Sequence, residues 1–177
     1  RSSPPTQSTD EPNPEVAAQC WDGDFVPALR DCSEPTGREG LAWAMPSIDL
    51  EDPVCADKAN SVPGKQLVFV CPFRFAGATG IIRYSWWNSA KSSRDYYRGD
   101  YSGVDPRRIS SGRTAPRLVW RLDKRTPQGL YRMTSTYLDW PFSVSVEAST
   151  LAAREAGYRQ VTFRPEAEMT GIATGSD

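Results

Sequence analysis

The sequence predicts an α+β domain built on an antiparallel sheet of about five to six strands, with two or three short helices. Strand-like runs alternate with turn residues from position 66 onward, and two separated stretches have helical spacing. The resulting order, β-β-α-β-β-β-α-β, has short links that favour antiparallel hairpins. Four cysteines precede or open this region, so we also expect a disulfide-tied N-terminal segment.

Six segments have the composition of strands. Residues 66–73 are apolar on both faces, which predicts a central strand. In residues 142–148 apolar side chains alternate with Ser143, Ser145 and Glu147, as in a strand with one solvated face. The remaining strands are expected at 79–86, 117–122 and 129–138, with a last candidate at 158–165.

A helix is predicted from Trp86 to Gly99, with Ser85 as its N-cap, and a second over residues 149–157. In the first helix Trp86 and Tyr97 share one stripe, which would pack on the sheet.

Three other rings of this region, Trp87, Tyr96 and Tyr101, would then point elsewhere. Flat rings can stack on the apolar face of a sugar, so these residues are candidate ligand-binding residues. The alternative is that they cover the disulfide-tied segment.

The cysteines are Cys20, Cys32, Cys55 and Cys71. No C-x-x-C pair and no histidine accompany them, so two disulfides are favoured over a metal site, and neither a metal nor a cofactor is expected. Of the three pairings, Cys20–Cys32 and Cys55–Cys71 close the shortest loops, each worth about 3 kcal/mol. Disulfides predict an exported chain, at the extracellular face of the plasma membrane or secreted.

Composition divides the chain into three parts. Residues 1–18 are rich in Pro, Ser and Thr and are expected to form a disordered linker. Residues 19–165 would be the extracellular α+β domain, and residues 166–177 a flexible tail. Since a linker connects two things, we expect a membrane anchor or another domain upstream of Arg1.

No catalytic residue is predicted. The chain has no histidine, which excludes Ser-His-Asp and Cys-His nucleophile systems, and we expect no enzymatic activity. A weaker alternative is a secreted hydrolase that uses carboxylates among Asp95, Asp100 and Asp105.

Charge is unevenly distributed although the net charge is only −1, a value that gives no reason to expect nucleic-acid binding. Residues 1–60 carry four basic and twelve acidic side chains, whereas residues 107–132 carry eight basic side chains against Asp123. One interpretation is an anion-binding face for cell-wall polymers or other anions, with Arg107, Arg108 and Arg113 as candidate ligand-binding residues. The other is that this strip pairs with the acidic N-terminal segment.

Several stretches resemble a known family: "QCWDG", "CSEPTGREGLAWAMPS", "IRYSWWNSA", "PFSVSVEAS" and "VTFRP". Over roughly residues 19–165 they are similar to extracellular C-terminal domains of actinobacterial membrane proteins, particularly receptor-type serine/threonine protein kinases. The resemblance implies an intracellular kinase domain, one transmembrane helix and a linker before a sensor domain. The chain itself contains no kinase motif.

We therefore expect an extracytoplasmic sensor or ligand-binding domain of an envelope signalling protein, which could act as a homodimer. Its ligand would be extracellular, for example a cell-wall glycan or an anionic polymer. The alternative is a secreted or lipid-anchored protein that binds cell-wall glycan.

Overall fold

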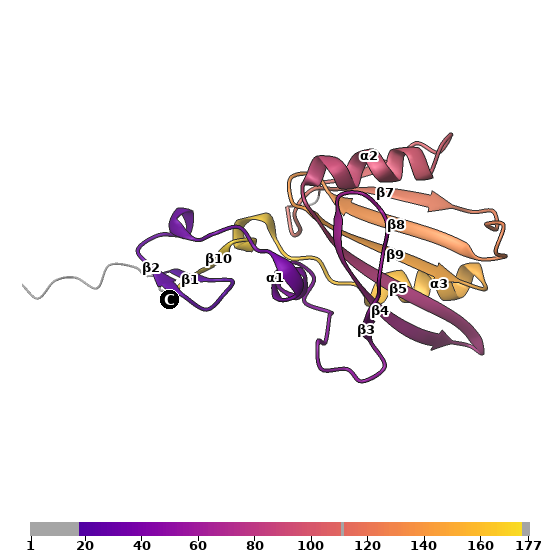
Figure 1. Cartoon of the computed structure of the whole chain (residues 1–177), viewed down its shortest axis with the longest axis horizontal. Helices are drawn as coiled ribbons and strands as arrows, with labels where there is room; N and C mark the ends of the chain where they lie inside the picture. Colours follow the sequence, from indigo (N-terminus) through magenta and orange to yellow (C-terminus); the bar gives the residue numbers. More distant parts are fainter. Residues whose placement is uncertain (1–17, 111, 175–177) are drawn as a thin grey trace, which may run out of the picture.

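The computed structural model describes residues 18–110 and 112–174. Within them the chain forms two antiparallel sheets and three α-helices, so the predicted α+β class is confirmed (Figure 1). The predicted linker at residues 1–18 lies outside the described residues, except for Ala18, which begins a strand. No helix in the described part of the chain has the length and apolar character that crossing a membrane requires.

The larger sheet, here called the main sheet, has seven strands in the order β3-β4-β5-β9-β8-β7-β6. The five interior strands are those that the sequence predicts. The edge strands β3 and β6 lie outside the segments that the sequence predicts as strands, since two or three residues are too few to show alternation. The bounds are β3 (Ala56–Asp57), β4 (Lys65–Phe75), β5 (Ala78–Trp87), β6 (Arg107–Ile109), β7 (Arg117–Leu122), β8 (Tyr131–Tyr137) and β9 (Phe142–Ala148).

A two-residue turn joins β4 to β5. Its residues, Ala76 and Gly77, both have positive φ angles, 48° and 81°. Such turns match the right-handed twist of the flanking strands. The two long strands consequently pair along almost their whole length, from Lys65 opposite Trp87 to Phe75 opposite Ala78.

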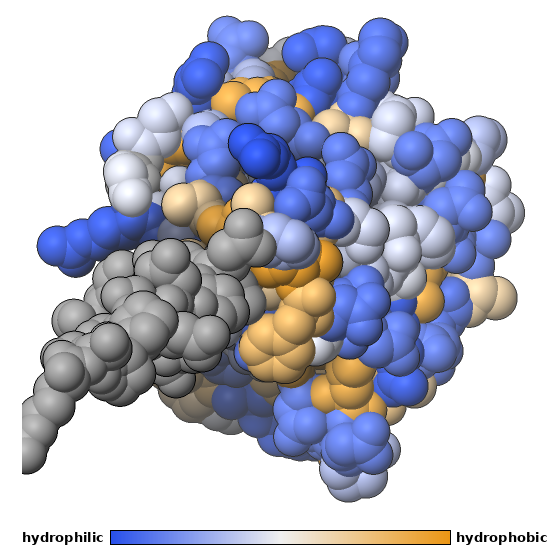
Figure 2. Space-filling view, turned by 90° about the vertical axis from the view of Figure 1, so that its left-hand side faces the viewer, coloured by the Kyte–Doolittle hydropathy of each residue, from blue (hydrophilic) through white to orange (hydrophobic). Residues whose placement is uncertain are grey.

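A second sheet, here called the small sheet, combines β1 (Ala18–Cys20), β2 (Phe25–Val26) and β10 (Gly171–Ala173), in the order β10-β1-β2. It lies at one end of the molecule, beyond α1 (Gly37–Ala44) (Figure 1). Apolar side chains gather among hydrophilic ones on this end (Figure 2). Two large hydrophobic side chains of the small sheet, Phe25 and Ile172, are exposed.

Residues 166–174 differ from the predicted flexible tail. They form the 3-10 helix η2 (Glu166–Glu168) and then β10, which pairs with β1. Met169 is fully buried, and a Cβ at Gly171 would lie only 2.4 Å from the Gln19 carbonyl oxygen. Burial of Met169 and the close backbone approach at Gly171 therefore fix this segment against the domain.

Both disulfides form with the predicted pairing. Cys20–Cys32 ties the small sheet to the turn that contains the 3-10 helix η1 (Leu29–Asp31), and Cys55–Cys71 ties the segment before β3 to β4. All four cysteines are accounted for.

One face of the main sheet packs against α1 and α3 (Leu151–Gln160). The main core lies there and includes Leu41 and Met45 from the α1 side and Val144 and Val146 from β9. The strand predicted at 158–165 does not form, since α3 continues to Gln160. Val161 and Phe163 then reach the core from an extended segment outside the sheet.

The opposite face carries α2 (Ala90–Asp100). This helix begins later than predicted. Trp86 and Trp87 stay in β5, because they continue its pairing with β4 and β9, and Ser89 rather than Ser85 is the N-cap.

The face of β9 predicted to be solvated is partly covered by α2. Ser143 is fully buried and Ser145 nearly so. The Trp87 indole N–H donates to the Ser143 hydroxyl at 2.8 Å, and Tyr101 and Thr134 share a hydroxyl bond of 2.7 Å. Serine and threonine on these strands therefore serve as hydrogen-bond partners for buried aromatic residues.

Candidate functional site

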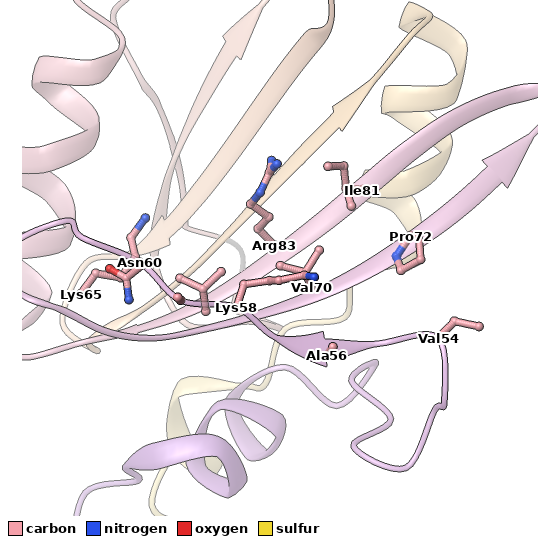
Figure 3. A pocket seen from close by; sticks show the side chains of 11 residues that line it. Val54, Ala56, Lys58, Asn60, Lys65, Val70, Pro72, Ile81 and Arg83 are labelled. Carbon is pink, nitrogen blue, oxygen red and sulfur yellow. The ribbon is translucent and has the colours of Figure 1, made fainter. Parts of the chain in front are cut away.

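The strongest candidate site is a depression of about 590 Å³ on the α2 side of the main sheet, at the edge that α2 leaves open (Figure 3). We call it the trough. Its floor is formed by β4 and β5 and its wall by the segment that enters and follows β3. The lining residues are Val54, Ala56, Lys58, Ala59, Asn60, Lys65, Val68, Val70, Pro72, Ile81 and Arg83.

Strand alternation places the floor residues. Val68, Val70 and Pro72 occupy every second position of β4 and so face the same side. Pro72 lies opposite Ile81 of β5, which adds a further apolar side chain. The opposite face of β4 sends Phe69 into the main core. The predicted two-faced apolar character of residues 66–73 thus reflects a core on one face and the trough on the other.

A smaller polar depression of about 190 Å³ adjoins the trough and shares Lys65 and Arg83 with it. We call it the polar pocket, and it extends below α2 toward β8. Its lining residues are Lys65, Arg83, Ser85, Tyr96, Tyr97, Asp100, Arg132, Ser145 and Glu147.

Both carboxylates of the polar pocket form ion pairs with arginines. Glu147 forms an ion pair with Arg83 from the neighbouring strand, and Asp100 of α2 pairs with Arg132 of β8 at 2.9 Å. These two pairs cancel in charge. The remaining cation of the pocket is Lys65, which forms no ion pair with a carboxylate of the described residues.

Lys65 lies where the two depressions meet. Its ammonium lies 4.7 Å from the ring centre of Trp87 and 4.8 Å from that of Tyr96, so cation–π attraction contributes to its position. Partial burial lowers the pKa of Lys65 to about 8, because desolvation disfavours the charged form. At neutral pH the group is still mostly protonated and presents a positive charge to the trough.

The wall of the trough is fixed at both ends. Near its start, the Cys55–Cys71 disulfide joins the wall to β4. Beyond its end, the backbone N–H of Asn88 donates to the Gly64 carbonyl at 2.8 Å. Between these two points, the backbone N–H of Lys58 donates to the Val68 carbonyl at 2.8 Å. The trough is therefore a preformed feature, as ligand sites usually are.

Two of the three aromatic residues predicted to bind a ligand belong to the core instead. Trp87 is fully buried and Tyr101 is 2% exposed, both in the cluster between α2 and the main sheet. The alternation of β5 aims Trp87 toward α2, and the last turn of α2 aims Tyr101 back to the sheet. Tyr96 is the exception, since it is half-buried and lines the polar pocket.

The predicted arginines lie away from the trough. Arg107 and Arg108 are exposed on β6, the edge of the main sheet opposite to β3, and Arg113 is exposed in the following loop. The structure thus does not bring them together with Tyr96 and the trough. The ion pairs of residues 107–132 are made with Asp100, Asp123 and Glu155, and none joins them to the described residues 18–60.

The three aspartates of the hydrolase alternative do not form a facing pair. Asp95 is on the exposed side of α2, where hydrogen bonding by Lys91 lowers the pKa of its carboxyl. Asp100 is turned toward Arg132, and Asp105 is exposed in the loop after α2. The described residues contain no group of three or more side chains suited to hold a metal ion.

Comparisons with protein-family models, with curated proteins and with solved structures found no match. The trough and its chemistry are therefore the basis for a functional proposal. Sequence reasoning missed Lys65 and Ile81. The one signal for the trough in the sequence was the apolar run of residues 66–73. One face of this strand packs on the core, so its second apolar face needed another partner.

Proposed function

We propose that this chain is an extracytoplasmic ligand-binding domain of an envelope signalling protein, non-catalytic by itself, and that the trough is its binding site. The observation that carries the proposal is the union, in one preformed depression, of an apolar floor and a half-buried cation without an ionic partner among the described residues. A desolvated charge costs stability, and side chains with strongly shifted pKa values cluster at binding and catalytic sites.

The extracytoplasmic part of the proposal is supported by the two disulfides, which are consistent with an oxidising environment. The signalling part, including an upstream kinase and anchor, rests on the resemblance of the quoted segments to receptor-kinase sensor domains. Ligand-induced pairing of protomers remains part of the same proposal.

The glycan-binding alternative has less support. A sugar platform needs exposed ring faces, and Trp87 and Tyr101 offer none. Among the residues lining the trough and the polar pocket, Tyr96 is the aromatic side chain with partial exposure, whereas Tyr97 is buried.

Amide NMR can test the site while the natural ligand is still unidentified. Two probes would be added to the isotope-labelled chain: soluble peptidoglycan fragments, and a lipid extract of an actinobacterial envelope. We expect shifts in β4, β5 and residues 54–60 for at least one probe. Val70→Arg, which fills the trough floor, should remove them, whereas Lys124→Met, an exposed change in the loop after β7 toward the opposite edge of the main sheet, should not. If neither probe shifts these residues, the proposal is wrong.

A further inference from the structure

We infer that the ligand of the trough is a single-chain amphipathic anion, whose alkyl chain lies on β4 and β5 and whose carboxylate or phosphate group binds at Lys65. This inference rests on the proposed function, because it names the ligand class of the same site. Three features support it: the shape of the trough, the order of polar and apolar side chains along it, and the positive charge that no ion pair of the described residues neutralises.

The apolar part of the trough is elongated. Its floor follows β4 from Val68 to Pro72, with Ile81 beside it, and Val54 forms the apolar wall at the far end (Figure 3). Measured along β4 from Lys65 to Pro72, the trough spans roughly 20 Å at the usual rise per residue. An extended alkyl chain fits such a strip, whereas a compact or branched polar ligand would leave the floor uncovered.

The charged side chains of the site lie at one end and in the middle of the trough, where Lys58 and Arg83 are, and the end formed by Pro72, Ile81 and Val54 carries none (Figure 3). Lys65 lies with Asn60 at the end opposite to Pro72 and Val54 (Figure 3). Since Glu147 neutralises Arg83 and Asp100 neutralises Arg132, the unbalanced charge facing a ligand is positive. A headgroup at Lys65 would therefore be an anion, and the amide of Asn60 and the exposed amine of Lys58 could donate further hydrogen bonds to it.

The alternative role of Lys65 is purely structural. Its alkyl stem and ammonium cover the rings of Trp87 and Tyr96, and a lysine can do so without binding anything. If Lys65 is purely structural, ligands with charged and uncharged heads should bind equally well. If it binds the headgroup, the charged ligands should bind more tightly, and the test compares the two.

The test is calorimetric titration of the unmodified chain with decanoate, decyl phosphate and 1-decanol, which share one chain and differ in the head. We expect the two anions to bind with a dissociation constant on the order of 10 μM. 1-Decanol should bind ten- to a hundredfold more weakly, the range of one charge-assisted hydrogen bond. Within the anion series each added methylene should tighten binding by roughly two- to fourfold until the trough is filled.

Variants then assign the headgroup to Lys65. Lys65→Met keeps most of the stem and should weaken decanoate to the level of 1-decanol, whereas Lys65→Arg should stay within about threefold of the unmodified chain. Lys124→Met, which removes an exposed lysine elsewhere, should have no effect. Since the comparison of heads needs no substitution, misfolding of a variant would not obscure the result.

Vesicles separate the two sources of such an anion. Sedimentation with vesicles of phosphatidylglycerol and phosphatidylcholine that depends on Lys65 would assign the headgroup to a membrane lipid. Binding of decanoate without sedimentation would assign it to a free acid. Equal affinity for decanoate and 1-decanol, or no binding of any of the three, would overturn the inference. Peptidoglycan fragments that shift the trough residues while decanoate does not would overturn it and leave the proposed function standing.

Discussion

Lys65 shows what a single residue contributes here and why the sequence did not reveal it. It stands at the start of β4, and the rings around it come from β5 and α2. Nothing in the local pattern of residues 60–70 distinguishes a lysine on a solvated surface from one enclosed by distant aromatic residues. Only the pairing of β4 with β5, which sets Lys65 opposite Trp87, creates this environment.

The lowered pKa of Lys65 gives a prediction about stability. Below about pH 8 the folded chain holds a partly desolvated ammonium, whereas the unfolded chain holds a solvated one. We expect Lys65→Met to raise the free energy of unfolding at pH 7 by roughly 1 kcal/mol, since the cation–π contacts offset part of the desolvation cost. Between pH 8 and about pH 10 the unfolded state binds more protons, so the unmodified chain should gain stability relative to the variant. Denaturant unfolding at pH 7 and pH 9.5 measures both effects, and a gap that widens with pH contradicts the argument.

Tyr101 tests the distinction between core and binding residues. Its hydroxyl and that of Thr134 are 2.7 Å apart beneath α2, and Thr134 in turn bonds Ser145. Tyr101→Phe should lower the free energy of unfolding by about 1–2 kcal/mol, because it leaves a buried hydroxyl short of a partner. Tyr96→Phe is the matched control and should change it little, since the Tyr96 hydroxyl makes no hydrogen bond within the described residues. Weaker binding of decanoate by Tyr101→Phe at unchanged stability would instead return Tyr101 to the binding site.

At the scale of elements, the sequence revealed those that are long and periodic. The five interior strands of the main sheet carry enough alternating or apolar residues to be recognised. The start of α2 was placed too early, because Trp86 and Trp87 also fit the spacing of the helix that follows. Aromatic residues are common in strands, and cross-strand partners on β4 and β9 decide the outcome.

Two segments near the C-terminus show how tertiary contacts override local pattern. Residues 161–165 have the composition of a strand but form single backbone bonds to two different segments. Arg164 donates to the Ala44 carbonyl and accepts from Ala115. Residues 171–173 have mostly small side chains, which do not predict an ordered strand. They form one because the edge of β1 is available for pairing and because Gly171 lets the two backbones come close together. Neither partner can be identified from the segment alone.

The two disulfides form a matched pair for testing the trough wall. Both close loops of similar length, with sequence separations of 12 and 16, and each should contribute about 3 kcal/mol to stability. Cys55–Cys71 anchors the wall beside Val54, whereas Cys20–Cys32 lies in the small sheet. Replacing Cys55 and Cys71 by serine should therefore weaken decanoate binding about tenfold or more, as well as lower stability.

The Cys20→Ser, Cys32→Ser chain should lose a similar amount of stability and keep its affinity for decanoate. Unfolding curves and titrations on the two double variants, at a temperature where both remain folded, provide the comparison. Equal loss of affinity in both would mean that the disulfides act on overall stability alone and that the wall has no separate role.

In the whole molecule the small sheet lies at one end, away from the main sheet that carries the trough (Figure 1). The trough is lined by β3, β4 and β5, and β4 and β5 form the longest strand pair of the fold. A ligand held there contacts β4 and β5, whose long pairing we expect to open only when the domain unfolds. Its binding energy should therefore appear in global stability and not only in local order.

The last prediction follows from this coupling. At decanoate concentrations one hundred times the dissociation constant, the free energy of unfolding should rise by about 2.7 kcal/mol, which for a chain of this size raises Tm by about 5–10 °C. Hydrogen exchange at temperatures well below Tm should slow in β4, β5 and residues 54–60, while β1 and β2 of the small sheet exchange at their former rates through local opening. Lys65→Met provides the control for both measurements and should show neither change at the same decanoate concentration. Protection confined to the small sheet, beside the exposed Phe25 and Ile172, would place the alkyl chain there and contradict the trough as the binding site.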